Sequence, residues 1–273
     1  MKVFKLLITL TFVTILMGCI PDPGWLKHAR AQVALGQGDY DLAIQELKSC
    51  IETSDASGVS LCTIVLGQTY LNEGQFSDAI LHLKKAVELE LNNPATSADT
   101  KSGILYWLGA AYYRNQEYQK AINTFEQGIK FNPSDVRNFE WLSYAHYALG
   151  QYDEAITAAK RAIELKPDNA SAYNYLVGAA YGMKKQYNEA MKALKKAIEI
   201  DPKMTTAYDW MGRFLAEQNA YNEAAEAYKK GIEAAPSKPD LRESLAIAYY
   251  RMGKYDDALA SVNKAIELQS ITG

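Results

Sequence analysis

Apolar, aromatic and small residues recur along this chain at nearly fixed distances from one another. Seven alanines follow one another at intervals of roughly 34–42 residues, at Ala43, Ala79, Ala121, Ala155, Ala190, Ala224 and Ala258. Each has an aromatic residue three positions before it and a β-branched residue eight positions after it, as in Tyr118 and Ile129 around Ala121. Self-similarity at this period is typical of stacked supersecondary units, so the pattern predicts an elongated solenoid of helices without one central core.

The repeated unit resembles the tetratricopeptide repeat, in which about 34 residues form two antiparallel helices. That repeat has small residues at its eighth and twentieth positions, large ones at the fourth, seventh, eleventh and twenty-fourth, and a proline near the thirty-second. In residues 102–135 these positions read Leu105, Leu108, Gly109, Tyr112, Ala121, Phe125 and Pro133. The resemblance implies an all-α, right-handed superhelical solenoid of about seven helix pairs, at about 24–57, 60–93, 102–135, 136–169, 170–204, 205–238 and 239–272.

The recurring positions are suited to packing rather than to chemistry. Small residues such as Gly109 and Ala121 let the two helices of a unit approach closely, while Tyr118 and Ile129 fill the wedge between them. A proline cannot donate the next helical hydrogen bond, so the second helices should end near Pro133, Pro167, Pro202 and Pro236.

The first two units depart from the pattern. Lys27, Arg30 and Ala34 stand where large apolar residues are expected, which favours a cap with a polar outer face over a divergent repeat. Between the second and third units lie eight extra residues, 94–101, which we interpret as a loop that can act as a hinge.

The fifth unit contains one extra residue. It lies either near Val177, in the first helix, or in the turn at residues 184–186. The sequence leaves both positions open.

The first residues of the chain resemble a bacterial lipoprotein signal. Lys2 and Lys5 precede an apolar run over residues 6–16, and Leu16, Gly18 and Cys19 match the cleavage box. The resemblance implies a signal peptide at residues 1–18, a lipid attached to Cys19 and a short tether over residues 19–23. The alternative is an uncleaved anchor with an ordinary cysteine.

The residue after Cys19 bears on localisation. In lipoproteins of diderm bacteria an aspartate at that position retains the protein in the inner membrane, and here it is Ile20. The resemblance therefore implies an outer-membrane protein that faces the periplasm, or a cell-surface protein if the host has a single membrane.

Charge and motifs exclude several classes of function. The 29 basic and 32 acidic residues of the chain leave no basic excess for nucleic acid. Among His28, His82 and His146 no pair has metal-ligand spacing, and no nucleophile elbow, phosphate loop or Cys-x-x-Cys motif occurs. We therefore expect a protein that is not an enzyme and has no metal and no cofactor.

Cys50 and Cys62 belong to neighbouring units. Adjacent helices of a stack can bring such positions together, and an oxidising compartment would favour a disulfide. The alternative is that both are small buried core residues, since Cys50 stands where other units carry alanine or glycine.

The first helices of the units carry a ladder of aromatic residues with interleaved arginines. In tetratricopeptide arrays these helices line a concave groove, so the resemblance makes the ladder a candidate partner-binding groove. Its members are Tyr106, Trp107, Tyr113, Arg114, Arg137, Trp141, Tyr144, Tyr147, Tyr175, Trp210, Arg213 and Arg251, with Tyr181 and Tyr250 at the same position as Tyr113. The alternative is that the rings pack against neighbouring helices and are mostly hidden.

Tryptophan, tyrosine and arginine dominate interface hot spots, so the leading hypothesis is a membrane-anchored scaffold for a protein partner in cell-envelope assembly. Pilus, secretion or cell-wall machinery would be its setting. A second hypothesis is a carbohydrate-binding lipoprotein of exopolysaccharide export, because aromatic faces also stack on sugar rings. A chaperone-tail clamp is set aside, since no three successive units carry its lysine and asparagine pattern.

Overall fold

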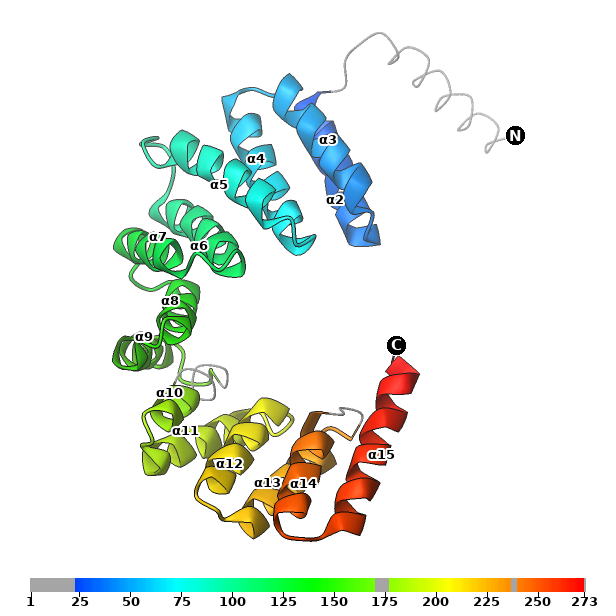
Figure 1. Cartoon of the computed structure of the whole chain (residues 1–273). Helices are drawn as coiled ribbons and strands as arrows, with labels where there is room; N and C mark the ends of the chain where they lie inside the picture. The colour runs from blue at the N-terminus through cyan, green and yellow to red at the C-terminus, as the bar shows by residue number, and fades with distance from the viewer. Residues whose placement is uncertain (1–22, 170–176, 237–239, 273) are drawn as a thin grey trace, which may run out of the picture. The chain divides into compact units, whose positions relative to one another are not determined.

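The computed structural model describes residues 23–169, 177–236 and 240–272, and within these ranges it contains helices and turns but no strand (Figure 1). The chain divides into two compact units, one ending at Pro133 and the other beginning at Ser134. Each unit is described by itself below. The predicted all-α class is confirmed, whereas Cys19 and Tyr175 lie outside the described residues.

The described part of the N-terminal unit, residues 23–133, contains three helix pairs. They are α2 (Gly24–Gln37) with α3 (Tyr40–Thr53), α4 (Ala56–Asn72) with α5 (Phe76–Glu90), and α6 (Ala98–Arg114) with α7 (Tyr118–Phe131). The second helix of one pair packs on the first helix of the next, α3 on α4 and α5 on α6. The core therefore runs along the stack, as expected for a repeat array.

The C-terminal unit is built in the same way. Its helices are α8 (Val136–Ala148), α9 (Tyr152–Leu165), α10 (Ala180–Met183), α11 (Tyr187–Ile200), α12 (Thr205–Glu217), α13 (Tyr221–Ala234), α14 (Asp240–Arg251) and α15 (Tyr255–Thr272). Here α11 packs on α12 and α13 packs on α14. The first helices α12 and α14 also contact each other, which places two first-helix faces side by side.

Helix ends follow local chemistry. The second helices α7, α9, α11 and α13 end at Phe131, Leu165, Ile200 and Ala234, each two residues before a proline. The turn inside every pair has one residue with positive φ, two positions before the aromatic residue that begins the second helix. Glycine occupies this position at Gly38, Gly74, Gly150 and Gly253, whereas Gln116, Lys185 and Asn219 adopt it without glycine.

The predicted small-residue columns are buried. Ala43, Ala121 and Ala224 have no exposed surface, and a Cβ atom added at Gly109 would lie 2.4 Å from the Phe125 ring. The missing side chain at Gly109 is therefore what lets Phe125 pack between α6 and α7.

The polar residues of the first helix contact the second helix of the same pair. Lys27 Nζ donates a hydrogen bond to Ser49 Oγ at 2.6 Å, and Arg30 lies 4.0 Å from the Glu46 carboxylate. Polar contacts between α2 and α3 therefore occur at positions where other units have apolar side chains, and Ala34 is buried.

The interpretation of residues 94–101 as a loop is wrong for its second half. Ser97 is the N-cap of α6, and its hydroxyl accepts a hydrogen bond from the Thr100 backbone N–H at 3.1 Å. This cap, with Asp99 in the first turn, stabilises an extra helical turn that begins at Ala98. Only residues 91–97 connect α5 to α6.

The structure also locates the extra residue of the fifth unit. Residues 177–179 form a π-helical turn that leads into α10, and a π turn holds one residue more than an α turn. The turn at residues 184–186 has the same form as in the other pairs, with Lys185 at the positive-φ position. The insertion is therefore in the first helix, near Val177.

Candidate functional site

The predicted groove residues lie on the first helices of both units. Tyr106, Trp107, Tyr113 and Arg114 belong to α6 in the N-terminal unit; Arg137, Trp141, Tyr144, Tyr147, Trp210, Arg213 and Arg251 belong to α8, α12 and α14 in the C-terminal unit. All the rings among them are half-buried, and all four arginines are exposed. The rings thus combine packing contacts with accessible edges.

On α6 the rings pack edge to face. The Tyr106 and Trp107 rings are 4.9 Å apart, and Trp107 also packs against the core of its unit. Tyr113 contacts Tyr118, the first residue of α7, with 5.4 Å between ring centroids. These contacts fix the rings on rigid helices, which lowers the entropy that a partner would have to remove on binding.

On α8 the same arrangement recurs. Trp141 and Tyr144 are 5.9 Å apart, and Tyr147 contacts Tyr152 at 5.5 Å. Arg137 donates to both carboxylate oxygens of Asp135, with both distances 2.9 Å. Because Asp135 is also the N-cap of α8, this guanidinium is held at the start of the helix.

The most developed group is on α12. The Trp210 ring stacks on Phe214 with centroids 5.2 Å apart, and the Arg213 guanidinium lies 5.1 Å from the centre of the same indole. Asp209 is 3.6 Å from Arg213 and accepts a 3.0 Å hydrogen bond from the Ser244 hydroxyl of α14. One carboxylate therefore links α12 to α14 and positions the arginine.

A hollow of about 530 Å³ lies between α12 and α14, and we call it the α12–α14 hollow. Arg213 and Arg251 line it together with Ile247, which is 63% exposed. Arg251 has no ion pair with another residue in the described ranges of the chain. The hollow thus offers exposed guanidinium groups beside an exposed apolar side chain.

A buried side chain forms the floor of the hollow. Tyr228 lines it from α13 and is 3% exposed. Burial raises the pKa of its phenol well above the ordinary value of 10, and the nearby Asp209 carboxylate raises it further. The hydroxyl therefore remains a neutral hydrogen-bonding group at any physiological pH.

Tyr181 does not share the environment of Tyr113, and its placement in the ladder is wrong. The π turn shifts the register, so that Tyr181 packs into the apolar cores around Ala159 and Leu194. Gly182 follows it, and a Cβ atom there would lie 1.9 Å from the Phe214 ring. Phe214 from α12 therefore fills the space beside Tyr187 that a tyrosine fills in other pairs, with 5.9 Å between the two rings.

Sequence reasoning missed Ile247 and the hollow itself. Ile247 stands at the ninth position of its unit, which faces the groove in tetratricopeptide arrays, so its position was a usable signal. Asp209 and Ser244 belong to different repeats, and no local sequence pattern predicts the hydrogen bond between them.

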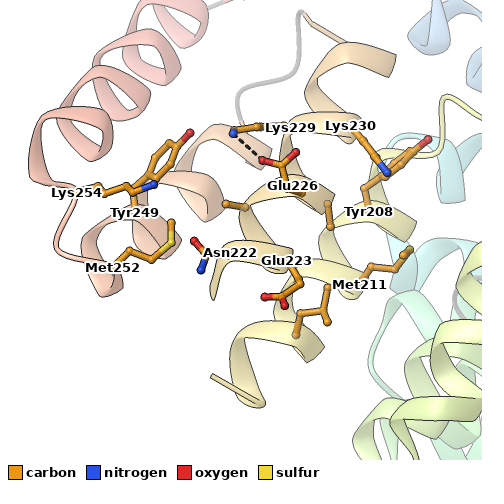
Figure 2. Close-up of a pocket in the computed structure, with 13 residues that line it drawn as sticks. Tyr208, Met211, Asn222, Glu223, Glu226, Lys229, Lys230, Tyr249, Met252 and Lys254 are labelled. Atoms are coloured by element: carbon orange, nitrogen blue, oxygen red, sulfur yellow. Dashed lines mark hydrogen bonds and ion pairs between the residues drawn. The ribbon is translucent and has the colours of Figure 1, made fainter. Parts of the chain in front are cut away.

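A second hollow, of about 510 Å³, lies over α13 in the same unit (Figure 2). Met211 and Met252 line it from opposite sides of α13. Lys229 donates to Glu226 at 2.8 Å and lies 5.8 Å from the centre of the Tyr249 ring. The hydrogen bond to Glu226 raises the pKa of Lys229, so this ammonium group is engaged within the unit.

Cys50 of α3 and Cys62 of α4 form a disulfide with an S–S distance of 2.08 Å. Both residues are almost completely buried. The bond joins the first helix pair to the second. The alternative of two separate core thiols does not describe this structure.

Two further observations concern the described residues alone. No three of their histidine, cysteine and acidic side chains are grouped so that they could bind a metal ion. None of the helices over these ranges combines the length and the apolar character needed to cross a bilayer.

Models of known families match most of the array. Two models of the tetratricopeptide repeat match residues 64–93 and 142–205. A model of the anaphase-promoting complex, cyclosome, subunit 3 matches residues 95–162 and 183–265, more than half of the chain. The crystal structure of a tetratricopeptide repeat protein from Parabacteroides merdae covers 90% of this chain and 93% of its own, with a TM-score of 0.72 at 15% identity. This chain belongs to the tetratricopeptide repeat family.

Other similar proteins cover shorter stretches. The crystal structure of MamA is 26% identical and covers 60% of this chain and 96% of its own, with a TM-score of 0.52. A thermophilic tetratricopeptide repeat protein of Thermus thermophilus is 26% identical over 61% of this chain and 91% of its own, with a TM-score of 0.51. A peroxisomal targeting signal receptor of Pichia angusta is 25% identical over 41% of this chain, which spans only 25% of the receptor's length. The tetratricopeptide repeat is a protein-interaction scaffold, and that coarse function applies to this chain.

Proposed function

We propose that this protein is a membrane-anchored, non-enzymatic scaffold that binds a protein or peptide partner along the first helices of its repeats. The α12–α14 hollow carries the proposal. It combines an exposed apolar side chain, Ile247, with two exposed arginines beside the buried Tyr228. Fully formed pockets lined by aromatic and arginine side chains are where most interface energy is concentrated.

A peptide fits this hollow better than a neutral glycan. The indole of Trp210, which a sugar ring would need, already contacts Phe214 and the Arg213 guanidinium. An extended peptide needs only the exposed groups, with an apolar side chain on Ile247 and a carboxylate near Arg251. The receptor relative from Pichia angusta supports a binding role, since its name describes a receptor.

Photocrosslinking tests the hollow directly. A benzophenone amino acid placed at Ile247 should attach to the partner in cells, whereas the same residue at Glu199, exposed on α11, should not. Combining the Ile247 probe with Arg213→Ala and Arg251→Ala should abolish the adduct. Equal adducts from both probe positions, or an adduct that survives the arginine changes, would contradict this binding surface.

The ionic strength distinguishes the two ligand classes. Binding of an acidic peptide to exposed arginines should weaken at least several-fold between low and about 0.5 M salt, because the charges are screened. Binding of a neutral glycan should change little. A salt-independent affinity that is lost in a Trp210→Ala variant would favour the carbohydrate hypothesis instead.

The membrane anchor is a separate part of the proposal and rests on the sequence around Cys19. We propose that Cys19 carries the lipid, that the protein faces the periplasm from the outer membrane, and that its partner belongs to envelope assembly, such as pilus, secretion or cell-wall machinery. Lipid chains contribute roughly 0.8 kcal/mol per buried methylene, so two or more chains would anchor it stably. Metabolic labelling with a palmitate analogue should give a signal that Cys19→Ala removes, and unchanged labelling in that variant would refute lipidation at this residue.

A further inference from the structure

Two opposite charges line the α12–α14 hollow without pairing with each other. Glu217 of α12 and Arg251 of α14 occupy the same position in successive repeats, and both side chains are exposed. Their helices contact each other, and each residue is at the end of its helix. No ion pair joins the two side chains in the described part of the chain. At this level the hollow therefore presents a carboxylate from α12 and a guanidinium from α14.

The Glu217 carboxylate is held in place but is not neutralised. The Tyr187 hydroxyl of α11 donates a hydrogen bond to Glu217 Oε2 at 2.9 Å, and a phenol brings no opposite charge. Arg213, one helical turn before Glu217, lies 3.6 Å from the Asp209 carboxylate and 5.1 Å from the centre of the Trp210 indole. That guanidinium is thus engaged with other groups, and the charge of Glu217 remains available to a ligand.

An apolar contact point lies beside these charges. Ile247 is one helical turn before Arg251 on α14, lines the same hollow and is 63% exposed. A ligand that covers Ile247 also removes water from the charged groups next to it. Losing that hydration is unfavourable unless the ligand supplies a group of opposite charge to each of them.

We propose that the α12–α14 hollow recognises a mixed-charge peptide segment. A basic side chain pairs with Glu217, an acidic side chain pairs with Arg251, and an apolar side chain contacts Ile247. This inference rests on the proposed function of the hollow and adds the basic group and its position. A segment with two acidic side chains would place one carboxylate near Glu217, and a segment with two basic ones would place an ammonium group near Arg251. Such like-charge contacts exclude both classes.

Three dye-labelled peptides of the same length test the charge pattern. Each has a central leucine and two charged residues, separated by alanines so that the three side chains share one face of an extended chain. The charged residues are lysine and glutamate, two glutamates, or two lysines. In fluorescence anisotropy at about 50 mM salt, where screening is weak, the full-length protein should bind the mixed-charge peptide most tightly. The expected difference is roughly two- to five-fold, the range for one exposed ion pair.

Reversing one charge of the hollow should exchange the preference. Glu217→Lys should bind the doubly acidic peptide best, and Arg251→Glu should bind the doubly basic one best. Glu199→Lys is the matched control, because it makes the same charge change on α11, where Glu199 pairs with Lys196 at 3.1 Å outside the hollow. It should keep the wild-type order of affinities.

Glu217→Gln separates the charge from the hydrogen bond, since its amide oxygen can still accept from Tyr187. This variant should bind the mixed-charge and doubly acidic peptides equally. A wild type that binds none of the three peptides, or the doubly acidic one best, would overturn the proposal, as would an unchanged order in Glu217→Lys. The crosslink from Ile247 tells this failure apart from failure of the proposed function. An adduct in cells without the mixed-charge preference rejects only the charge pattern, whereas loss of both rejects the hollow as a binding surface.

Discussion

Glycine positions under aromatic rings decide how closely the helices of this protein approach. A Cβ atom would lie 2.4 Å from Phe125 at Gly109, and 1.9 Å from Phe214 at Gly182. The first contact is within one helix pair, whereas the second joins α10 to α12 of the next pair. The same residue type therefore serves both the folding of a pair and the stacking of pairs.

Gly182→Ala should destabilise the C-terminal unit. The methyl group would have to displace the buried Phe214 ring, which typically costs about 1–3 kcal/mol in an overpacked core. Gly36→Ala is the matched control, because nothing lies within 4 Å of a Cβ atom there and Gly36 is inside α2. That change should stabilise by roughly 0.5–1 kcal/mol. Urea unfolding measures both, and an equal response of the two variants would contradict the tight contact at Gly182.

His82 should make the stability of the N-terminal unit depend on pH. Burial lowers the pKa of its imidazole below the ordinary value of 6.5, although Asp78 opposes the shift. The ring stacks on Tyr70 with centroids 5.4 Å apart. The pKa of His82 is lower in the folded state than in the unfolded state. Its contribution to the free energy of unfolding is therefore complete above pH ~6.5 and is lost as the pH falls through the folded pKa.

The comparison with His82→Gln isolates this effect. The wild type should lose more unfolding free energy than the variant between about pH 7.5 and 5.5, because only the wild type gains a proton on unfolding. Chemical denaturation at a series of pH values measures the difference. Parallel curves for the two proteins would show that the imidazole is not perturbed.

At the scale of elements, the π turn at residues 177–179 lies where the repeat of the fifth unit has one residue more than its neighbours. Gly178 stands twelve residues before Ala190, just as Gly109 stands twelve before Ala121. Leu176, counted from the start of its unit, corresponds to Leu108. Val177 is the extra residue between them. The π turn provides room for this residue directly before Gly178.

Deleting Val177 should therefore be tolerated. The deletion restores the length of the neighbouring units, and Leu176 and Gly178 become adjacent, as Leu108 and Gly109 are. The residues from Gly178 to Met183 should then be α-helical, with a thermal unfolding midpoint equal to or above that of the wild type. Circular dichroism measures it. A deletion that unfolds the unit would show that the π turn is needed for packing. Both Val177 and Ala180 are buried, but Ala180 is not an extra residue of the repeat, so its deletion should be damaging as a control.

At the scale of the whole molecule, each helix pair depends on its neighbours. The Cys50–Cys62 disulfide crosses one such boundary, between α3 and α4. It closes a loop with a sequence separation of 12, for which chain entropy predicts a stabilisation of about 3 kcal/mol. Because stability in repeat arrays is a sum of local and nearest-neighbour contributions, the effect should remain local.

Replacing both cysteines by alanine should lower the protection of backbone amides against hydrogen exchange in the N-terminal unit alone. Hydrogen exchange should speed up in α2 to α5 and stay unchanged in α12 to α15. Alanine suits the site of Cys50, since it occupies the same column in other units. Faster exchange throughout the chain would mean that the array unfolds as one cooperative body instead.

The sequence by itself determined the helix pairs, their small-residue columns and their ends. These features are local or strictly periodic: a proline ends a helix wherever it stands, and Gly109 with Phe125 follows a spacing that repeats in other units. The aromatic and arginine positions of the first helices were also readable, because position in the repeat predicts the face.

Only the tertiary structure shows the features that depend on contacts between different repeats or between residues far apart in the sequence. The link from Asp209 to Ser244 and the place of the extra residue at Val177 are examples. So is the contrast between the buried Tyr228 and the exposed Val262, which occupy the same position in successive units. The repeat pattern of the sequence does not distinguish these two residues. Whether another helix covers the position determines whether its side chain is buried or exposed to solvent.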